Sequence, residues 1–213
     1  MRMHRLITIA ATGLIAGTAT VASAQGLQPV DKQYSFGILA GVNLATMAGN
    51  DVANVSNRTG FVGGLSTWFR AYEQLGFEAD LLYAQKGAKG TGAGVTGTLQ
   101  HDYIEVPLLA RFDFTTSSEK VRPFLALGPS FGFSVRCRVE ATSGGVSASA
   151  SCADAGLDEN KFDVGGTAGA GLGFPMGRST FTVGVRYTYG FTNVEKNYDA
   201  KNRVWSFLAG LSW

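Results

Sequence analysis

The sequence predicts an all-β fold: an eight-stranded antiparallel up-and-down transmembrane β-barrel that follows a cleaved signal peptide. Three observations predict it, namely a basic and then apolar leader, segments with an apolar residue at every second position, and connections that alternate between short and long. The 213 residues include 29 Gly and 5 Pro, and 11% are aromatic. Such a composition with short apolar alternations is typical of sandwiches and barrels rather than of helical folds.

The N-terminal segment has the layout of a secretory signal peptide. It begins with Arg2 and Arg5, continues with an apolar run and ends in Ala-Ser-Ala before Gln25. We therefore expect a signal peptide at residues 1–24 and an outer-membrane β-barrel domain at residues 25–213. The apolar run is interrupted by Gly and Thr and is shorter than the ~20 residues of a membrane-spanning helix, which disfavours an uncleaved anchor.

Charge and motif content exclude several functions. The chain has 18 Lys and Arg against 16 Asp and Glu, and loss of Arg2 and Arg5 with the leader leaves sixteen of each sign. A balanced charge gives no support for a nucleic-acid partner. We expect no metal, because His101 is the single histidine after the leader, and no cofactor, because Pro175 rather than a helix follows the glycine-rich stretch 169–174.

Eight segments carry the period-two alternation of a strand. The clearest is 181–191, where Phe, Val and Tyr on one face alternate with Thr, Gly and Arg on the other. Pro107 is unfavourable within the fourth segment, because proline cannot donate to a strand ladder. The predicted strands are 34–45, 59–70, 76–87, 102–114, 122–138, 162–174, 180–192 and 203–213.

The connections place the barrel in a bacterial outer membrane. Short turns alternate with long segments rich in Gly, Ser, Asn and charge at 46–58, 88–101, 139–161 and 193–202. Short periplasmic turns and long external loops are the pattern of outer-membrane barrels, and an even strand number then places both termini in the periplasm. A soluble barrel such as a lipocalin has the same period, but here the polar face consists mainly of Gly, Ser and Thr, which suits a narrow lumen.

The C-terminal segment "RVWSFLAGLSW" ends within an apolar alternation. Trp205, Phe207, Leu211 and Trp213 lie on one face of the last strand. The segment resembles the C-terminal signal by which outer-membrane barrels are recognised for assembly, with Trp213 in place of the more usual Phe. The alternative is an ordinary closing strand, whose backbone groups must all be paired in lipid.

Five segments together resemble a known family. "FEADLLYAQKG", "DYIEVPLLARF", "VRPFLALGPSFGF", "FDVGGTAGAGLGF" and "KNRVWSFLAGLSW", in this order, are similar to the strand motifs of the PorT-like outer-membrane β-barrel domain proteins. The resemblance covers nearly the whole chain after the leader and implies an outer-membrane barrel. It also accounts for Pro107, and it raises the possibility of a link to protein secretion.

The two cysteines depart from that family pattern and predict a disulfide. Cys137 and Cys152 lie in an exported chain, their number is even, and no third thiol competes. Closing a loop of about 15 residues contributes on the order of 3 kcal/mol in the chain-entropy model.

The inward phase of the strands predicts a network of buried charges in the lumen. Glu78, Asp80, Glu105, Arg111 and Arg186 all point inward, and pairing of the third and fourth strands brings Glu78 near Arg111. Unpaired charges are strongly disfavoured in a narrow interior, so these groups should form ion pairs. Eight strands leave little room for an aqueous channel. The alternative is a set of separate polar contacts.

The predicted function is structural or interactive: adhesion, anchoring or assistance to secretion. Expected partners are outer-membrane lipid, the barrel assembly machinery and an extracellular or periplasmic protein. A small diffusion channel is the alternative. A less favoured one is a lipid-modifying enzyme in which His101 and Ser134 meet near the outer mouth, because Asp102, adjacent to His101, points to the opposite face and is badly placed to orient it.

Overall fold

The computed structural model describes residues 29–52, 54–92, 94–116 and 120–213, with backbone alone for 29–33. The predicted signal peptide and its cleavage site lie outside these residues. No helix in the described part of the chain is long and apolar enough to cross a membrane. The strands are β1 Pro29–Ala48, β2 Val55–Tyr72, β3 Leu75–Gly92, β4 Val95–Asp113, β5 Arg122–Ser143, β6 Val146–Ser151, β7 Phe162–Met176, β8 Ser179–Glu195 and β9 Tyr198–Ser212.

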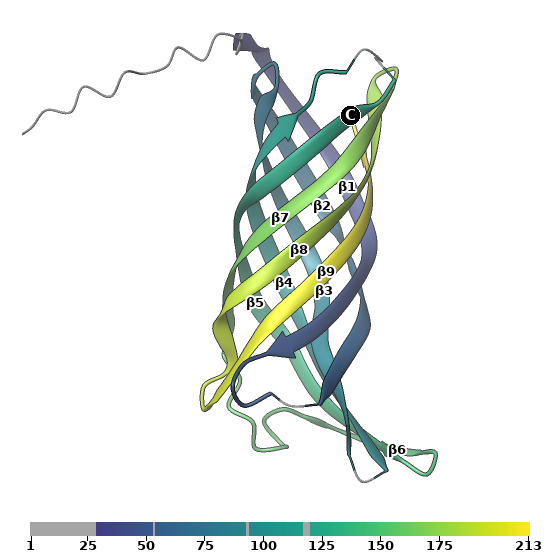
Figure 1. Ribbon diagram of the computed structural model, residues 1–213, viewed down its shortest axis with the longest axis vertical. Coiled ribbons are helices and arrows are strands. Elements are labelled where there is room, and N and C mark those ends of the chain that lie inside the picture. Colours follow the sequence, from purple (N-terminus) through teal and green to yellow (C-terminus); the bar gives the residue numbers. More distant parts are fainter. Residues whose placement is uncertain (1–28, 53, 93, 117–119) are drawn as a thin grey trace, which may run out of the picture.

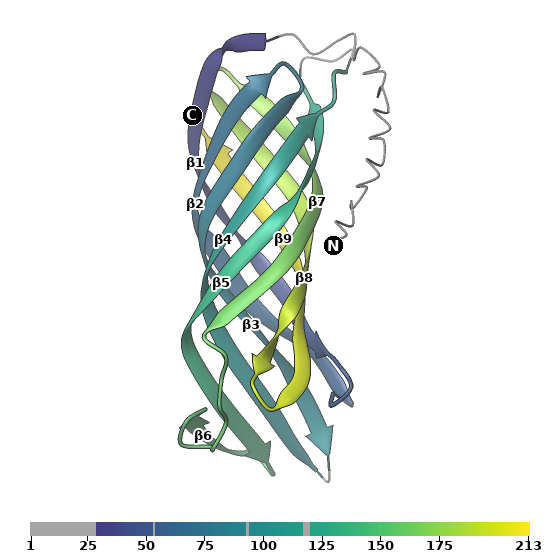
Figure 2. The ribbon, with the colours of Figure 1, turned by 90° about the vertical axis from the view of Figure 1, so that its left-hand side faces the viewer.

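Eight of these strands close into a barrel. Each strand of the ring pairs antiparallel with its neighbours in the order β1, β2, β3, β4, β5, β7, β8 and β9, and β9 returns to pair with β1 (Figures 1 and 2). The seam runs from Gly37 opposite Ser212 to Ala48 opposite Lys201. Reciprocal backbone hydrogen bonds of 2.8 and 3.1 Å join Trp213 to Phe36. The predicted eight-stranded all-β fold is therefore confirmed.

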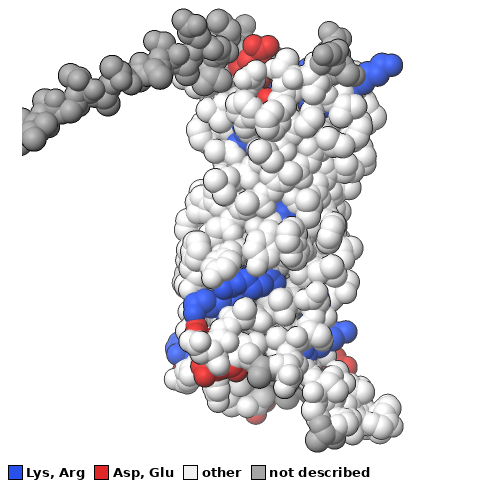
Figure 3. All heavy atoms as spheres, in the orientation of Figure 1, with Lys and Arg blue, Asp and Glu red and all other residues white. Residues whose placement is uncertain are grey.

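The period-two alternation becomes an inner and an outer face. On β8, Arg186 and Thr188 are buried in the lumen, whereas Tyr189 and Phe191 are exposed. Large apolar side chains are exposed in this way on every strand of the ring, and charged side chains gather towards the two ends (Figure 3). An inward glycine makes room for a larger neighbour: a Cβ on Gly171 would lie 2.5 Å from the Phe124 ring. An apolar outer band with a polar interior is the arrangement of a membrane barrel.

Two of the predicted long loops are strands. β3 and β4 continue to Gly92 and from Val95, and β8 and β9 continue to Glu195 and from Tyr198, so 88–101 and 193–202 are mostly hairpin. Their Gly, Thr and polar composition favours a loop. Backbone pairing between the adjacent strands nevertheless extends the ladders through both segments. Only the short turns between these strands remain as connections.

The predicted loop 139–161 contains β6, which is not part of the ring. β5 continues to Ser143, and β6 turns back to pair with it from Arg138 opposite Ser151 to Ser143 opposite Val146. We call the end that carries β6 the hairpin end and the opposite end, with the β2–β3, β4–β5 and β7–β8 turns, the turn end. The hairpin end lies at the bottom of Figure 1.

The structure joins Cys137 and Cys152 in a disulfide. Cys137 lies on β5 and Cys152 follows β6 directly, so the bridge joins the two strands at the base of this hairpin. No cysteine of the described residues is free.

Pro107 is accommodated within β4. The pairing of β3 with β4 passes from Ala79 opposite Leu108 to Leu82 opposite Glu105 without a change of register. The proline therefore interrupts the β3 ladder locally and leaves the inward phase of Glu105 unchanged.

Candidate functional site

Four of the five predicted lumen charges form one network, which we call the arginine network: Glu78, Asp80, Arg111 and Arg186. Arg186 on β8 reaches across the lumen to both carboxylates of β3, with Nη1 2.6 Å from Asp80 Oδ2 and Nη2 bound to Glu78 Oε1. Arg111 on β4 contacts the other oxygen of Glu78 at 3.4 Å. The side chains of Glu78 and Asp80 are 4% and 0% exposed.

The arrangement follows from strand phase and from closure of the ring. Residues two apart on β3 share the inward face, so Glu78 and Asp80 offer adjacent carboxylates to one guanidinium fork. Closure places β8 across the narrow lumen from β3, which brings together residues 108 positions apart. A bidentate Arg is suited to this geometry because its two terminal nitrogens bind separate oxygens.

Glu105, the fifth predicted residue, lies in a different cluster. Its Oε2 is 2.8 Å from Lys86 Nζ, and Lys86 also lies 3.3 Å from Asp163 Oδ2. The Ser130 hydroxyl donates to the other oxygen of Glu105 at 2.6 Å, and the Asn202 amide donates to Asp163 at 2.8 Å. We call Lys86, Glu105 and Asp163 the lysine cluster.

Sequence reasoning missed Lys86 and Asp163 as members of this set. The signal for Lys86 was present, since it shares the inward phase of Glu78 and Asp80 on β3. Asp163 is the first inward residue of β7, and only the register of β7 places it opposite Gly132 of β5 and near Lys86. All three side chains of the cluster are buried.

His101 and Ser134 do meet at the hairpin end of the lumen. His101 Nε2 is 2.9 Å from Ser134 Oγ and 3.0 Å from Glu159 Oε2, and its Nδ1 is 3.1 Å from the Tyr103 hydroxyl. Asp102 instead accepts a hydrogen bond from Tyr83 at 2.7 Å, in agreement with its opposite orientation. Glu159, which precedes β7, was not predicted as part of this group.

The hydrogen bonds of this group are those of a structural contact. Ionised Glu159 can only accept, so Nε2 facing it carries the proton and Nδ1 accepts from Tyr103. The Ser134 hydroxyl then donates to Glu159 at 2.9 Å. Partial burial raises the pKa of Glu159, but hydrogen bonds from Lys161, Ser134 and His101 outweigh it and hold that pKa below its usual value. His101 in this tautomer has no lone pair facing Ser134 with which to take its proton.

The same group provides no metal site. Ligand atoms of His101, Cys137 and Glu159 lie within 4.8 Å of one another, the one such set among the described residues. The sulfur of Cys137 is in a disulfide, whereas metals bind the thiolate. Two possible ligands remain, fewer than a zinc site uses.

The residues of the predicted assembly signal all lie on the outer surface, three on β9 and Trp213 directly after it. Trp205, Phe207, Leu211 and Trp213 are exposed, and Trp205 packs on Tyr187 of β8 with ring centroids 4.7 Å apart. Their alternate partners on β9, such as Val204 and Leu208, are buried in the lumen.

Comparison with known proteins identifies the family of this barrel. Residues 23–196 match the sequence family described as outer membrane protein beta-barrel domain. The chain belongs to that family. The outer-membrane location predicted from the connections is therefore confirmed. A search of curated proteins finds no match.

Solved structures of other outer-membrane barrels are similar at low identity. Neisserial surface protein A is 18% identical with a TM-score of 0.48, over 83% of this chain and 95% of that one. The attachment invasion locus protein Ail of Yersinia pestis is 18% identical with a TM-score of 0.44, over 84% and 98%. Outer membrane protein W of E. coli is 18% identical with a TM-score of 0.41, over 83% and 96%.

Proposed function

We propose that this outer-membrane barrel is a structural or interaction protein that presents its hairpin end outside the cell and binds a protein partner there. Both termini then lie in the periplasm, with lipid and the assembly machinery as its other partners and the β9 aromatics as the assembly signal. Adhesion, anchoring and the secretion role suggested by the PorT-like resemblance are specific forms of this role. The observation that carries the proposal is the sheet extension at the hairpin end.

This extension has the features of a binding surface. β6 pairs with β5 along one edge only, and all six of its residues are exposed. An open strand edge offers unpaired N–H and C=O groups to an extended segment of another chain. The disulfide at its base limits the freedom of the hairpin, which lowers the ordering cost of binding.

Site-specific crosslinking tests the proposal. A photoreactive residue at Ser149 on β6 should give a discrete protein adduct in intact cells. Ser147→Pro should reduce it, because the alternation of bonded pairs from Cys137 and Cys152 leaves the Ser147 N–H on the open edge. The matched position is Arg178 in the β7–β8 turn, where we expect no adduct. Adducts from Arg178 alone would place the partner at the turn end and overturn the proposed surface.

We further propose that side chains close the lumen. The arginine network and the lysine cluster place seven charged groups in the lumen, six of them buried. In the same interior Thr167 is bonded to Thr188 at 2.8 Å and Ser206 to Asn43 at 2.7 Å. An eight-stranded barrel is just filled by side chains. Purified protein in a planar bilayer should therefore give no stable conductance steps. Large, stable single-channel steps would instead support a diffusion channel.

A non-catalytic role is also part of the proposal. His101 and Ser134 are 1% and 3% exposed, and the hydrogen bonds of His101 leave it no basic nitrogen towards Ser134. His101→Ala should leave the lipid A and phospholipid composition of cells unchanged, measured by mass spectrometry. The control is an empty-vector strain lacking the protein. A profile that differs from the wild type in the same way in His101→Ala and in that strain would support a lipid-modifying enzyme.

A further inference from the structure

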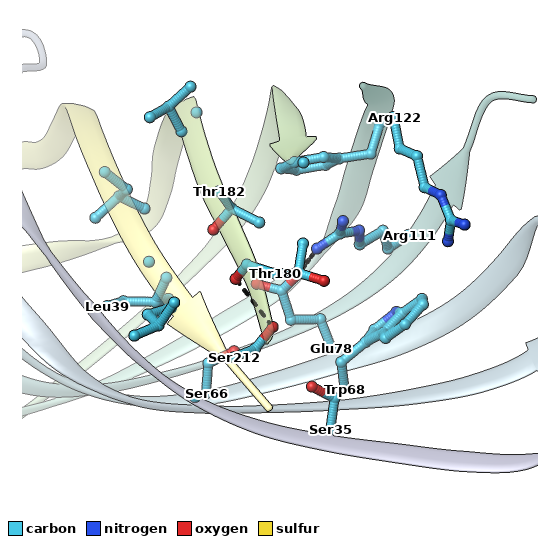
Figure 4. Close-up of a pocket in the computed structure, with 18 of the residues that line it drawn as sticks. Ser35, Leu39, Ser66, Trp68, Glu78, Arg111, Arg122, Thr180, Thr182 and Ser212 are labelled. Atoms are coloured by element: carbon cyan, nitrogen blue, oxygen red, sulfur yellow. Dashed lines mark hydrogen bonds and ion pairs between the residues drawn. The ribbon is translucent and has the colours of Figure 1, made fainter. Parts of the chain in front are cut away.

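A cavity at the turn end of the lumen is lined by four arginines: Arg70 of β2, Arg111 of β4, Arg122 of β5 and Arg186 of β8. It has a volume of about 100 Å³, several times the space that one water molecule needs. Figure 4 shows Arg111, Arg122 and Trp68 on the same side of this cavity. Glu78, Arg111 and Arg186 of the arginine network line this cavity as well.

Two of the four arginines are neutralised by contact. Arg186 pairs with Glu78 and Asp80. Arg111 is the second. Its Nε and Nη2 donate to Asp113 Oδ1 at 3.1 and 3.0 Å, and Nη1 faces Glu78 at 3.4 Å. Its guanidinium also lies 3.8 Å from the centre of the Phe124 ring. Asp113 and Glu78 are thereby committed to Arg111, and Glu78 is shared with Arg186.

Arg70 and Arg122 have no such partner among the described residues. Asp113 and Glu73 attract Arg70 only at a distance, and neither forms an ion pair with it. The Arg70 guanidinium stacks on the Trp68 ring at 4.5 Å, and its buried Nε, like the buried Trp68 Nε1, lacks an acceptor. The cavity is lined by four guanidinium groups and by two carboxylates, Glu78 and Asp113. Two guanidinium forks that line one cavity and have no carboxylate partner of their own are suited to an oxyanion.

We propose that this cavity binds a small oxyanion, a phosphate or carboxylate group, between the guanidinium groups of Arg70 and Arg122. Among the residues that line the cavity, the one buried side-chain acceptor without a donor is Asp113 Oδ2, whose carboxylate is already held by Arg111. In the proposed orientation the site opens to the periplasm, so its ligand is a periplasmic anion, whereas the outer hairpin faces the opposite side. The site is thus separate from the proposed protein-binding surface.

Nuclear magnetic resonance of the folded protein in micelles tests the site. With tryptophan labelled with nitrogen-15, the indole signal that disappears in Trp68→Phe belongs to Trp68, beside Arg70. Inorganic phosphate at constant ionic strength, balanced with chloride, should shift this signal along a saturable curve. A parallel acetate titration distinguishes the two sources: tighter phosphate binding indicates a phosphate group, and tighter acetate binding a carboxylate.

The variants make the test decisive. Arg70→Met and Arg122→Met should each weaken the affinity about tenfold or more, since a charge-assisted hydrogen bond is lost. Arg178→Met removes an exposed arginine at the same end that does not line the cavity, so it should leave the affinity unchanged. Isothermal titration of each variant, with folding checked by circular dichroism, gives an independent affinity. No saturable shift with either anion, or equal affinity in all three variants, would overturn the proposal.

Discussion

Arg186→Met should lower the thermal stability of the barrel in detergent more than any exposed charge substitution. Loss of Arg186 leaves the carboxylates of Glu78 and Asp80, two residues apart and buried, with only Arg111 to compensate Glu78. Removing one partner from a buried ion pair costs about 3–5 kcal/mol. For a chain of this size that corresponds to a decrease in the unfolding temperature on the order of 10 °C. Circular dichroism during heating measures it.

Two comparisons determine whether the charges act as a network. Lys196→Met is the matched control, because Lys196 pairs with Asp158 at the hairpin end and both side chains are more than half exposed. We expect this control to change the stability by less than about 1 kcal/mol. Adding Glu78→Gln and Asp80→Asn to Arg186→Met should recover much of the loss, since the buried charges are then removed together. Equal and additive effects of all single substitutions would show independent contacts instead.

Lys86→Met is expected to have the second largest effect. It leaves Glu105 and Asp163 buried without the ammonium group that lies between them. The cost should again be about 3 kcal/mol or more, but below that of Arg186→Met, because Ser130 and Asn202 still donate to these carboxylates. Denaturant unfolding of the purified protein, followed by tryptophan fluorescence, measures it.

Lys89→Met provides the matched control on the same strand. Lys89 lies three residues further along β3 and is exposed, so its removal deletes the same charge and a similar length of side chain without uncovering a buried acid. We expect little change in stability. Equal losses from Lys86→Met and Lys89→Met would show that the lysine cluster does not stabilise the lumen.

The number of strands and the face of each strand on which a side chain lies were predictable from the sequence, because both depend on local periodicity. The alternation in 181–191 alone separates exposed Tyr189 and Phe191 from buried Arg186, and closure of the ring leaves this unchanged. The ends of the strands were less predictable. In 88–101 and 193–202 the composition favours a loop, and pairing with the adjacent strand overrides it.

The partners of the buried charges were only partly predictable. The pair Glu78 and Arg111 follows from adjacent strands, so sequence reasoning brought them together. Glu105 was assigned to the arginine network, but its carboxylate forms an ion pair with Lys86 on the adjacent strand instead of with an arginine. Glu159 was missed because it lies outside the alternating segments, and only the path of the chain after β6 places it against His101.

By itself the sequence determined that this chain crosses a membrane as eight strands, which face carries the charges, and that two cysteines are available to each other. The tertiary structure alone decided which charge meets which, and that the lumen divides into an arginine network and a lysine cluster. It also decided that Arg70 and Arg122, which form no ion pair among the described residues, line one cavity. The physical reason is distance along the chain. Side-chain phase is fixed every two residues, whereas contacts across the lumen join residues such as Glu78 and Arg186, 108 positions apart, and depend on ring closure and register.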